Sequence, residues 1–235
     1  MITLAFDSTA KVASVAVTDG ERALAVYSID NGLTQSELLL PMAEDALKSL
    51  KLSFDDVGLL ACAVGPGSFT GVRIGAALVK GIAFAKGIPC APVSTLEALA
   101  ENLFGISGII VPAMDARRSQ LYCAVFKSDG TKMERLTDDN AIPISELAAM
   151  LSEYDEDIYI VGDGYDVAVR ELSRLGIKLA VTPKLLRDEN AYSVARVGEK
   201  MYNEGKCVSD IDLQPTYLRV PQAERERLEK LNSAK

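Results

Sequence analysis

A glycine-rich loop, GPGSFTG at residues 65–71, carries the residue types best suited to binding a ligand. Glycine permits positive φ angles and a close approach of the backbone to a bound group, and Ser68 or Thr70 can cap the helix expected next. The amides at the start of that helix could receive an anion. A Walker-type loop has Lys-Ser or Lys-Thr after its last glycine, whereas Val72 and Arg73 follow here. The loop is therefore either a vestigial phosphate loop or a tight turn from strand to helix.

Further candidates stand where predicted strands end. Asp7 and Asp115 each end an apolar run, a place where a carboxylate can hold phosphate and magnesium if a glycine hairpin follows. No glycine occurs among the four residues after Asp7, so we favour hydrogen bonds from its own turn amides to this carboxylate. A Gly-Asp-Gly segment at 162–164 is either a second phosphate loop or a turn into a helix. The residues of a possible vestigial nucleotide loop are Asp7, Gly65, Gly67, Ser68, Gly71, Gly162 and Gly164.

Histidine is absent from all 235 residues. Its absence excludes His general bases, Ser-His and Cys-His dyads, and every metal site with a His ligand. The four cysteines, Cys62, Cys90, Cys123 and Cys207, lie far apart without a C-x-x-C pair, so we predict neither a disulfide nor a zinc site. We therefore expect no catalytic residue, no metal and no cofactor.

The charge balance bears on partners and location. With a net charge of −8, the chain is not expected to form the main surface for a nucleic acid, although a local basic patch near Arg117 and Arg118 is possible. No apolar run reaches the roughly 18–20 residues of a membrane span. The start, MITLAFDSTA, has no basic residue before its apolar stretch and predicts a buried strand rather than a signal peptide. We expect a cytoplasmic protein with no membrane contact.

The elements that must position these residues follow a pattern that occurs twice. Strands are predicted at 2–6, 12–18 and 22–29, with an Asp-Gly hairpin turn at 19–20, followed by a helix at 36–50 that a Thr34–Glu37 capping box begins. A strand at 59–64 and a helix at 72–86 follow. A short strand at 91–93 and a helix at 95–103 end this half. In the second half, strands at 108–114, 121–127 and 132–136 surround another Asp-Gly at 129–130. Helical patterns at 145–151, 167–175 and 191–203 surround a strand at 158–161.

This repeat predicts an α/β fold of two ribonuclease-H-like halves, as in the acetate kinase, sugar kinase, Hsp70 and actin superfamily. We expect an N-terminal lobe at 1–104 and a C-terminal lobe at 105–235.

Two helices carry more apolar surface than one sheet face needs. The helix at 36–50 has a wide apolar stripe, and the helix at 72–86 is apolar on nearly every side. Both could simply cover the sheet, but a helix that is apolar all round is buried all round, so we predict that a partner covers the rest. The residues predicted for this partner interface are Leu39, Met42, Ala43, Ala46, Leu47, Val72, Ala76, Val79 and Lys80.

Five segments together resemble one known family. They are ACAVGPGSFTGVRIG at 61–75, LAFDST at 4–9, SELLLPM at 36–42, VSTLEALA at 93–100 and PTYLR at 215–219. They are similar to the TsaB family, also called YeaZ, over nearly the whole chain. Where many members of that family have a histidine before the SELLLP-like segment, this chain has Gln35, which indicates a structural function for the segment.

The resemblance implies an actin-like ATPase fold with degraded nucleotide and metal sites. It implies a non-catalytic subunit that forms a heterodimer with TsaD, the paralogue that transfers threonylcarbamoyl to adenosine 37 of tRNAs reading codons that start with A. It also implies an assembly with the ATPase TsaE and contact with tRNA only through the complex. Without its partner, the chain could form a homodimer through the same helices.

Two other functions compete with this one. A small-molecule kinase or ATPase of the same fold needs the glycine-bearing hairpin after Asp7 that the sequence lacks. A protease or cell-wall factor acting alone needs a nucleophile and a base, and no histidine is present to serve as that base.

Overall fold

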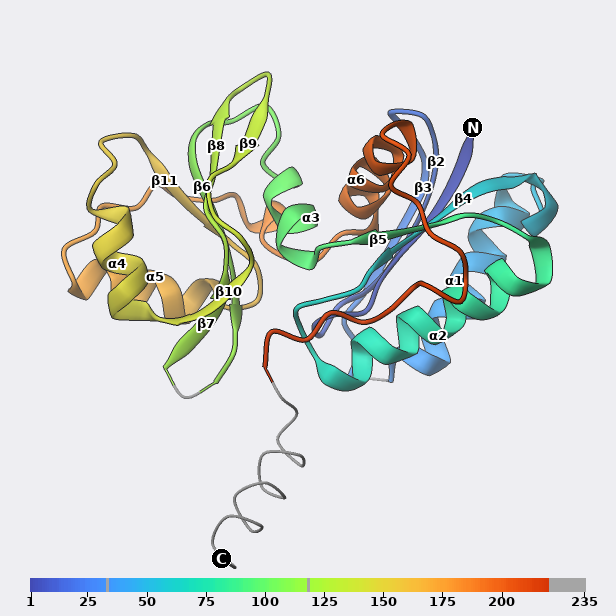
Figure 1. Cartoon of the computed structure of the whole chain (residues 1–235), viewed down its shortest axis with the longest axis horizontal. Coiled ribbons are helices and arrows are strands. Elements are labelled where there is room, and N and C mark those ends of the chain that lie inside the picture. The colour runs from blue at the N-terminus through green and yellow to red at the C-terminus, as the bar shows by residue number, and fades with distance from the viewer. Residues whose placement is uncertain (33, 118, 220–235) are drawn as a thin grey trace, which may run out of the picture.

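β1 (Ile2–Asp7) is the central strand of the first lobe in the computed structural model, which describes residues 1–32, 34–117 and 119–219 (Figure 1). The sheet has the order β3-β2-β1-β4-β5. β2 (Ala13–Asp19) and β3 (Arg22–Ile29) form antiparallel pairs next to β1, while β4 (Val57–Ala63) and β5 (Cys90–Val93) run parallel to it. Parallel neighbours require crossover connections, which here contain helices.

Helices cover both faces of this sheet. α1 (Gln35–Ser49) and α2 (Phe69–Lys86) are these crossovers and pack on one face, where Leu4 and Phe6 point. α6 (Ala191–Asn203) packs on the other face against Ala5 and its small neighbours. Because β1 is buried on both sides, Leu4, Ala5 and Phe6 at its centre are all apolar and do not alternate with polar residues. A 3₁₀ turn, η1 (Phe54–Asp56), precedes β4.

The second lobe is built around β6 (Ser107–Asp115). β7 (Gln120–Cys123) and β8 (Phe126–Asp129) are antiparallel to its two ends, and β11 (Ile158–Val161) is parallel to it. β9 (Met133–Arg135) and β10 (Asn140–Pro143) extend the sheet in the order β10-β7-β6-β8-β9. α4 (Ile144–Leu151) and α5 (Tyr165–Arg174) pack on this sheet, and the 3₁₀ turn η2 (Lys184–Leu186) leads back toward α6.

The arrangement confirms the predicted fold class, two ribonuclease-H-like halves of the acetate kinase, sugar kinase, Hsp70 and actin superfamily. Each half has a central strand that ends in Asp, an antiparallel neighbour and an Asp-Gly turn. The predicted capping box at Thr34 was wrong, since the Thr34 side chain bonds the Ser36 hydroxyl and caps no helix amide. The strand predicted at 121–127 is divided into β7 and β8, because residues 124–125 interrupt the pairing with β6.

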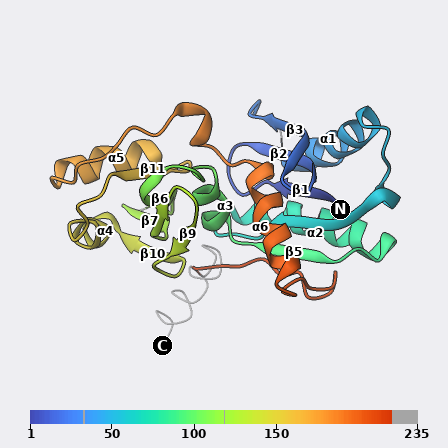
Figure 2. The ribbon, with the colours of Figure 1, turned by 90° about the horizontal axis from the view of Figure 1, so that it is seen from above.

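The chain crosses between the lobes more than once. α3 (Thr95–Glu101) connects them and lies at their junction in two views (Figures 1 and 2). α6 returns from the second half of the sequence to cover the first sheet, so the halves of the sequence interlace in space. The division at residue 104 stays a prediction, and residues 220–235 lie outside the described part of the chain.

A glycine of α6 gives a test of this packing. A Cβ at Gly198 would lie 2.6 Å from the Ala61 Cβ on β4, and neither atom can rotate away. We expect Gly198→Ala to destabilise the protein by about 1–3 kcal/mol through overpacking. Gly81→Ala is the matched control: its Cβ would meet nothing within 4 Å, and the exposed helical site should gain about 0.5–1 kcal/mol. Urea unfolding of both variants measures the difference, and equal effects at the two sites would contradict the packing.

Candidate functional site: the cleft between the lobes

The glycine loop at 65–71 is filled by this chain's own backbone. A Cβ at Gly67 would lie 2.4 Å from the Thr9 carbonyl oxygen, and one at Gly71 would lie 1.9 Å from the Ser8 carbonyl oxygen. Gly65 is equally close to the Thr216 carbonyl, at 2.5 Å. The three glycines are therefore required by contacts within the chain, because any side chain there would collide with rigid backbone.

Three amides around the start of α2, those of Ser68, Gly71 and Val72, are already bonded within the chain. The Ser68 amide donates to the Thr9 carbonyl over 2.6 Å, and the Val72 amide donates to the Ser68 carbonyl over 2.9 Å. Ser68 caps α2 as predicted, since its hydroxyl accepts from the Gly71 amide over 3.2 Å. With a carbonyl oxygen in the hollow of the loop, the residues present do not fit the phosphate of a nucleotide, because two oxygen acceptors would face each other there.

Asp7 lies beneath this loop at the end of β1. It is only 1 % exposed, and one carboxylate oxygen accepts hydrogen bonds from the Thr9 amide at 2.9 Å and the Thr9 hydroxyl at 2.7 Å. The predicted bond to the turn amide is thus confirmed. Burial raises the pKa of Asp7 to about 6, against the opposite effect of the two bonds from Thr9.

The second glycine segment is held in the same manner. The Gly162 amide donates to the Arg187 carbonyl and the Gly164 amide to the Ala113 carbonyl, and side chains at either position would meet that Ala113 oxygen. Asp163 between them accepts from the Asp115 amide over 3.2 Å. Burial raises the pKa of Asp163, although the bond from Asp115 opposes the rise.

A buried carboxylate that the sequence did not indicate lies nearby. Glu189 is 3 % exposed, and its Oε1 has no hydrogen-bond partner among the described residues. Burial, and next the charges of Asp7 and Asp163, raise the pKa of Glu189 well above its ordinary value. The segment that carries Glu189 crosses from the second lobe to the first, where the Ala191 amide donates to the Ser14 hydroxyl.

The two lobes enclose a cavity of about 620 Å³, within the usual range for a ligand site. Of the residues proposed for a nucleotide loop, Gly67 and Ser68 line it, while the others lie behind its wall. The polar and charged lining residues include Lys11, Gln35, Asp115, Arg117, Tyr122, Asp163, Tyr217 and Arg219. Arg118, named with Arg117 as a possible basic patch, lies outside the described residues.

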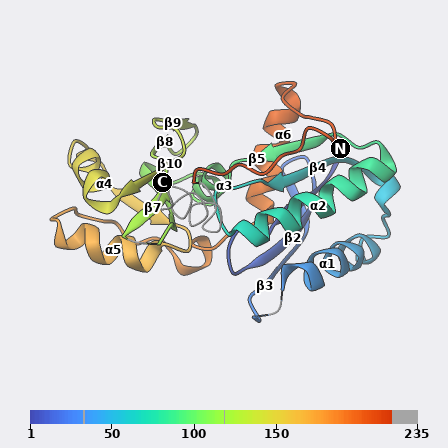
Figure 3. The same cartoon turned by 60° about the horizontal axis from the view of Figure 1, so that its bottom comes forward.

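The segment after α6 forms one rim of this cavity. It runs along α2 toward the second lobe (Figure 3), where the Arg219 guanidinium donates to the Ala116 carbonyl over 2.7 Å. On α2, the Arg73 guanidinium lies 3.7 Å from the centre of the Phe69 ring and donates to the Tyr217 hydroxyl. The PTYLR segment thus connects the start of α2, in the first lobe, with the second lobe.

Comparison with known proteins identifies the family to which this fold belongs. Residues 34–225 match the family model described as TsaD: tRNA N6-adenosine threonylcarbamoyltransferase. The chain belongs to this family. It is similar to the tRNA threonylcarbamoyladenosine biosynthesis protein TsaB of Bacillus subtilis, with 28 % identity over 97 % of this chain and 99 % of the relative, and to TsaB of Escherichia coli, with 28 % identity over 92 % and 94 %.

Solved structures agree with this assignment. A Pseudomonas aeruginosa protein described as similar to the peptidase YEAZ superposes with a TM-score of 0.81 and 26 % identity, covering 93 % of this chain and 99 % of that one. YeaZ from Pseudomonas aeruginosa gives a TM-score of 0.76 and 25 % identity over 92 % and 99 %. Within the family, the chain is therefore of the TsaB, or YeaZ, type.

Gln35, directly before the SELLLPM segment, bonds within the chain. The Gln35 amide donates to the Ala10 carbonyl over 2.9 Å at the edge of the cavity, which agrees with a structural function. Among residues 1–32, 34–117 and 119–219, no three acidic or thiol groups are arranged to hold a metal ion. No helix in this same part of the chain is long and apolar enough to cross a membrane.

The residues predicted for a partner interface lie mostly in the interior of this chain. Eight of them are at most 5 % exposed, and six of these, all but Val72 and Ala76, belong to the core between the two helices and the sheet: Leu39, Met42, Ala43, Ala46, Leu47, Val72, Ala76 and Val79. The ninth, Lys80, donates to the Ile211 and Leu213 carbonyls. An apolar stripe indicates that a face is buried but not what covers it, and here the sheet does. The outer face of α2 instead presents Ala77, Gly81 and Phe84, the last 81 % exposed.

The raised pKa of Asp7 predicts a pH-dependent stability. The folded state holds the Asp7 proton up to its pKa of about 6, whereas the unfolded chain loses the proton near the ordinary pKa of 3.8. The stabilisation is therefore complete at low pH and is lost as the pH rises toward 6. Asp7→Asn keeps the acceptor for Thr9 and removes the charge, so its stability relative to wild type should rise by about 2 kcal/mol from about pH 4.5 to about pH 7.5.

Urea unfolding at a series of pH values makes this measurement. Asp155→Asn, at an exposed site, serves as the control and should follow the wild-type profile. If the profiles of Asp7→Asn and wild type are parallel, Asp7 is not protonated in the folded state.

Proposed function

We propose that this chain is a non-catalytic subunit in the biosynthesis of N6-threonylcarbamoyladenosine at position 37 of tRNAs that read codons starting with A. It would act in the cytoplasm by forming a heterodimer with a TsaD-like catalytic paralogue and assembling with a TsaE-like ATPase. The observation that carries the proposal is similarity to named TsaB proteins along almost the full length of both chains. The net charge of −8 favours indirect contact with tRNA, through the complex.

The chemistry of the chain supports a role without turnover. No histidine is present to act as base or metal ligand. The Thr9 carbonyl occupies the glycine loop where a phosphate would lie. Asp7, the carboxylate at the end of β1, is directed to its own turn rather than into the cavity. These features disfavour a kinase or ATPase of the same fold.

The outer face of α2 is the partner surface that we propose. Ala77 and Gly81 are exposed and small, so the backbone of another helix could approach closely, and Phe84 offers an apolar side chain beside them. Ile211, 72 % exposed, lies next to this face because Lys80 binds its carbonyl. A paralogue with the same architecture would present an equivalent helix, giving a pseudo-symmetric pair; without it, a second copy could bind there.

A charge on this face should break the pair. We expect Phe84→Asp to fold normally, because the side chain is exposed, and to bind the purified TsaD-like partner at least about tenfold more weakly. Leu185→Asp on η2 is the matched control, since Leu185 is 93 % exposed and far from α2 in sequence. Isothermal titration calorimetry measures both affinities. Unchanged binding by Phe84→Asp would place the interface elsewhere.

Depletion of this protein should remove threonylcarbamoyladenosine from cellular tRNA. A catalytic subunit that keeps its working conformation only within the pair loses activity when its partner is absent. Mass spectrometry of tRNA nucleosides measures the loss. A copy with Leu185→Asp should restore the modification fully, whereas a copy with Phe84→Asp should restore it poorly. Normal modification after full depletion would refute the proposed function.

A further inference from the structure

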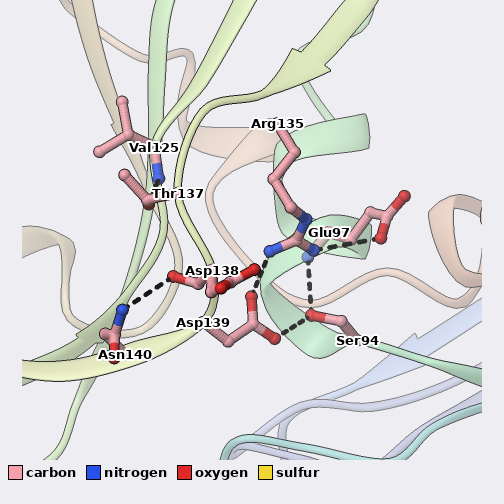
Figure 4. Close-up of polar contacts among 8 residues, drawn as sticks. All are labelled: Ser94, Glu97, Val125, Arg135, Thr137, Asp138, Asp139 and Asn140. Carbon is pink, nitrogen blue, oxygen red and sulfur yellow. Dashed lines mark hydrogen bonds and ion pairs between the residues drawn. The ribbon is translucent and has the colours of Figure 1, made fainter.

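Four polar side chains form a cluster at the junction of the lobes (Figure 4). The Arg135 guanidinium pairs with Asp139 at 2.5 Å through one nitrogen and with Glu97 at 3.1 Å through another. The Ser94 hydroxyl donates to the second oxygen of Asp139 over 2.6 Å. The guanidinium also lies 4.6 Å from the centre of the Phe126 ring. A forked guanidinium shared by two carboxylates and an aromatic ring is held in one geometry.

The cluster joins the two lobes through the start of α3. Ser94 directly follows β5 of the first sheet and caps α3 by accepting from the Glu97 amide. The amide of the next residue, Thr95, donates to the Gly65 carbonyl in the glycine loop. Arg135 and Asp139 belong instead to the second lobe, at the end of β9 and just before β10. The chain is thus held by both lobes at the point where it leaves the first sheet.

The other end of α3 is tied to the first lobe. Arg196 on α6 pairs with Glu101 at 2.7 Å, and the Ser193 hydroxyl donates to the Asn102 side chain. Between these ends, Leu96 and Leu99 of α3 pack on the second sheet, against residues such as Ile110. Rotation of the lobes about residues 93–95 would therefore separate Ser94 from Asp139, which Arg135 holds in place, while Glu97 would move with the second lobe. It would also break the contacts of Glu101 and Asn102 with α6.

The charged side chains of this cluster are partly shielded from solvent. The side chains of Arg135, Glu97 and Asp139 are 28 %, 33 % and 16 % exposed. Burial lowers the pKa of Arg135, but the bonds and charges of Asp139 and Glu97 outweigh this effect and leave it raised. The carboxylates thus compensate the desolvation of the guanidinium.

We propose that Arg135 is a positioning residue, the centre of an interlobe latch that fixes the angle between the lobes and with it the width of the cleft. The two walls of the cleft come from different lobes, Lys11 from the first and Arg117 from the second, so their separation depends on that angle. Hydrophobic packing holds α3 on the second sheet. The latch sets the angle between α3 and β5, the strand that precedes it.

Distance measurement between spin labels tests the latch in the isolated, full-length chain. Cys62, Cys90 and Cys123 are buried, so a Cys207→Ser background leaves two introduced cysteines for labelling, Ser49→Cys on α1 and Ser173→Cys on α5. We expect one narrow distance distribution in the reference protein. Arg135→Ala should broaden it roughly twofold or shift its maximum, because the lobes gain rotational freedom. Arg135→Lys keeps one charge but loses the fork, and should give an intermediate width.

Lys127→Ala is the matched control, since Lys127 pairs with Glu156 within the second lobe and its loss should leave the distribution unchanged. Circular dichroism and thermal unfolding separate a change of lobe angle from a loss of folded protein. If Arg135→Ala does not fold, Asp139→Asn and Ser94→Ala carry the same expectation. Folded latch variants with a reference-like distribution, even at lowered Tm, would overturn the proposal and leave the cluster a purely stabilising contact.

Discussion

The Ser8–Thr9 turn packs its backbone directly against the glycine loop at 65–71. Two carbonyl oxygens of the turn lie where side chains at Gly67 and Gly71 would begin, and the Ser68 amide binds one of them. This contact joins the end of β1 to the start of α2 and so sets the wall of the cleft. A loop rich in glycine is often a sign of a bound phosphate, but here the glycines make room for the chain itself.

The same contact explains the unusual acids nearby. Asp7 is buried because the turn folds over it, and its charge is offset only by bonds from Thr9. Glu189, on the segment that crosses between the lobes, lies near Asp7 and near Asp163 of the second lobe, and the charges of these two acids add to the effect of burial in raising its pKa. Carboxylates placed in this manner are acceptors within the fold and are poorly suited to hold a cation that must enter and leave.

Much of the fold was predictable from the sequence, because burial on both sheet faces produces unbroken apolar runs and the hairpins carry Asp-Gly. The strand Ile158–Val161 and the helix Ala191–Asn203 have the predicted bounds. The packing partner of α6 was not predictable, since helical periodicity gives a face but not what covers it. For the same reason, the buried stripe of α1 and α2 was assigned to a partner instead of the chain's own sheet. β10 was not predicted at all.

The polar part of the site was least accessible to sequence reasoning. Glu189 stands in a polar segment, and nothing in its neighbours indicates burial. The Arg135 cluster joins Glu97 to residues about forty positions later, a separation for which no motif exists. Only the PTYLR segment carried a signal for Tyr217 and Arg219, through its resemblance to the family.

We propose that this TsaB-type chain acts by association, and the structure shows that the backbone of its own Ser8–Thr9 turn fills the glycine loop. Titration of ATP with magnesium into the isolated, isotope-labelled chain, followed by amide NMR, tests it most directly. We expect no saturable shift of the Thr9, Gly67 or Ser68 amides at millimolar nucleotide, because the Thr9 carbonyl already occupies the loop. Saturable shifts at these amides would contradict it, since the turn would then give way to a phosphate.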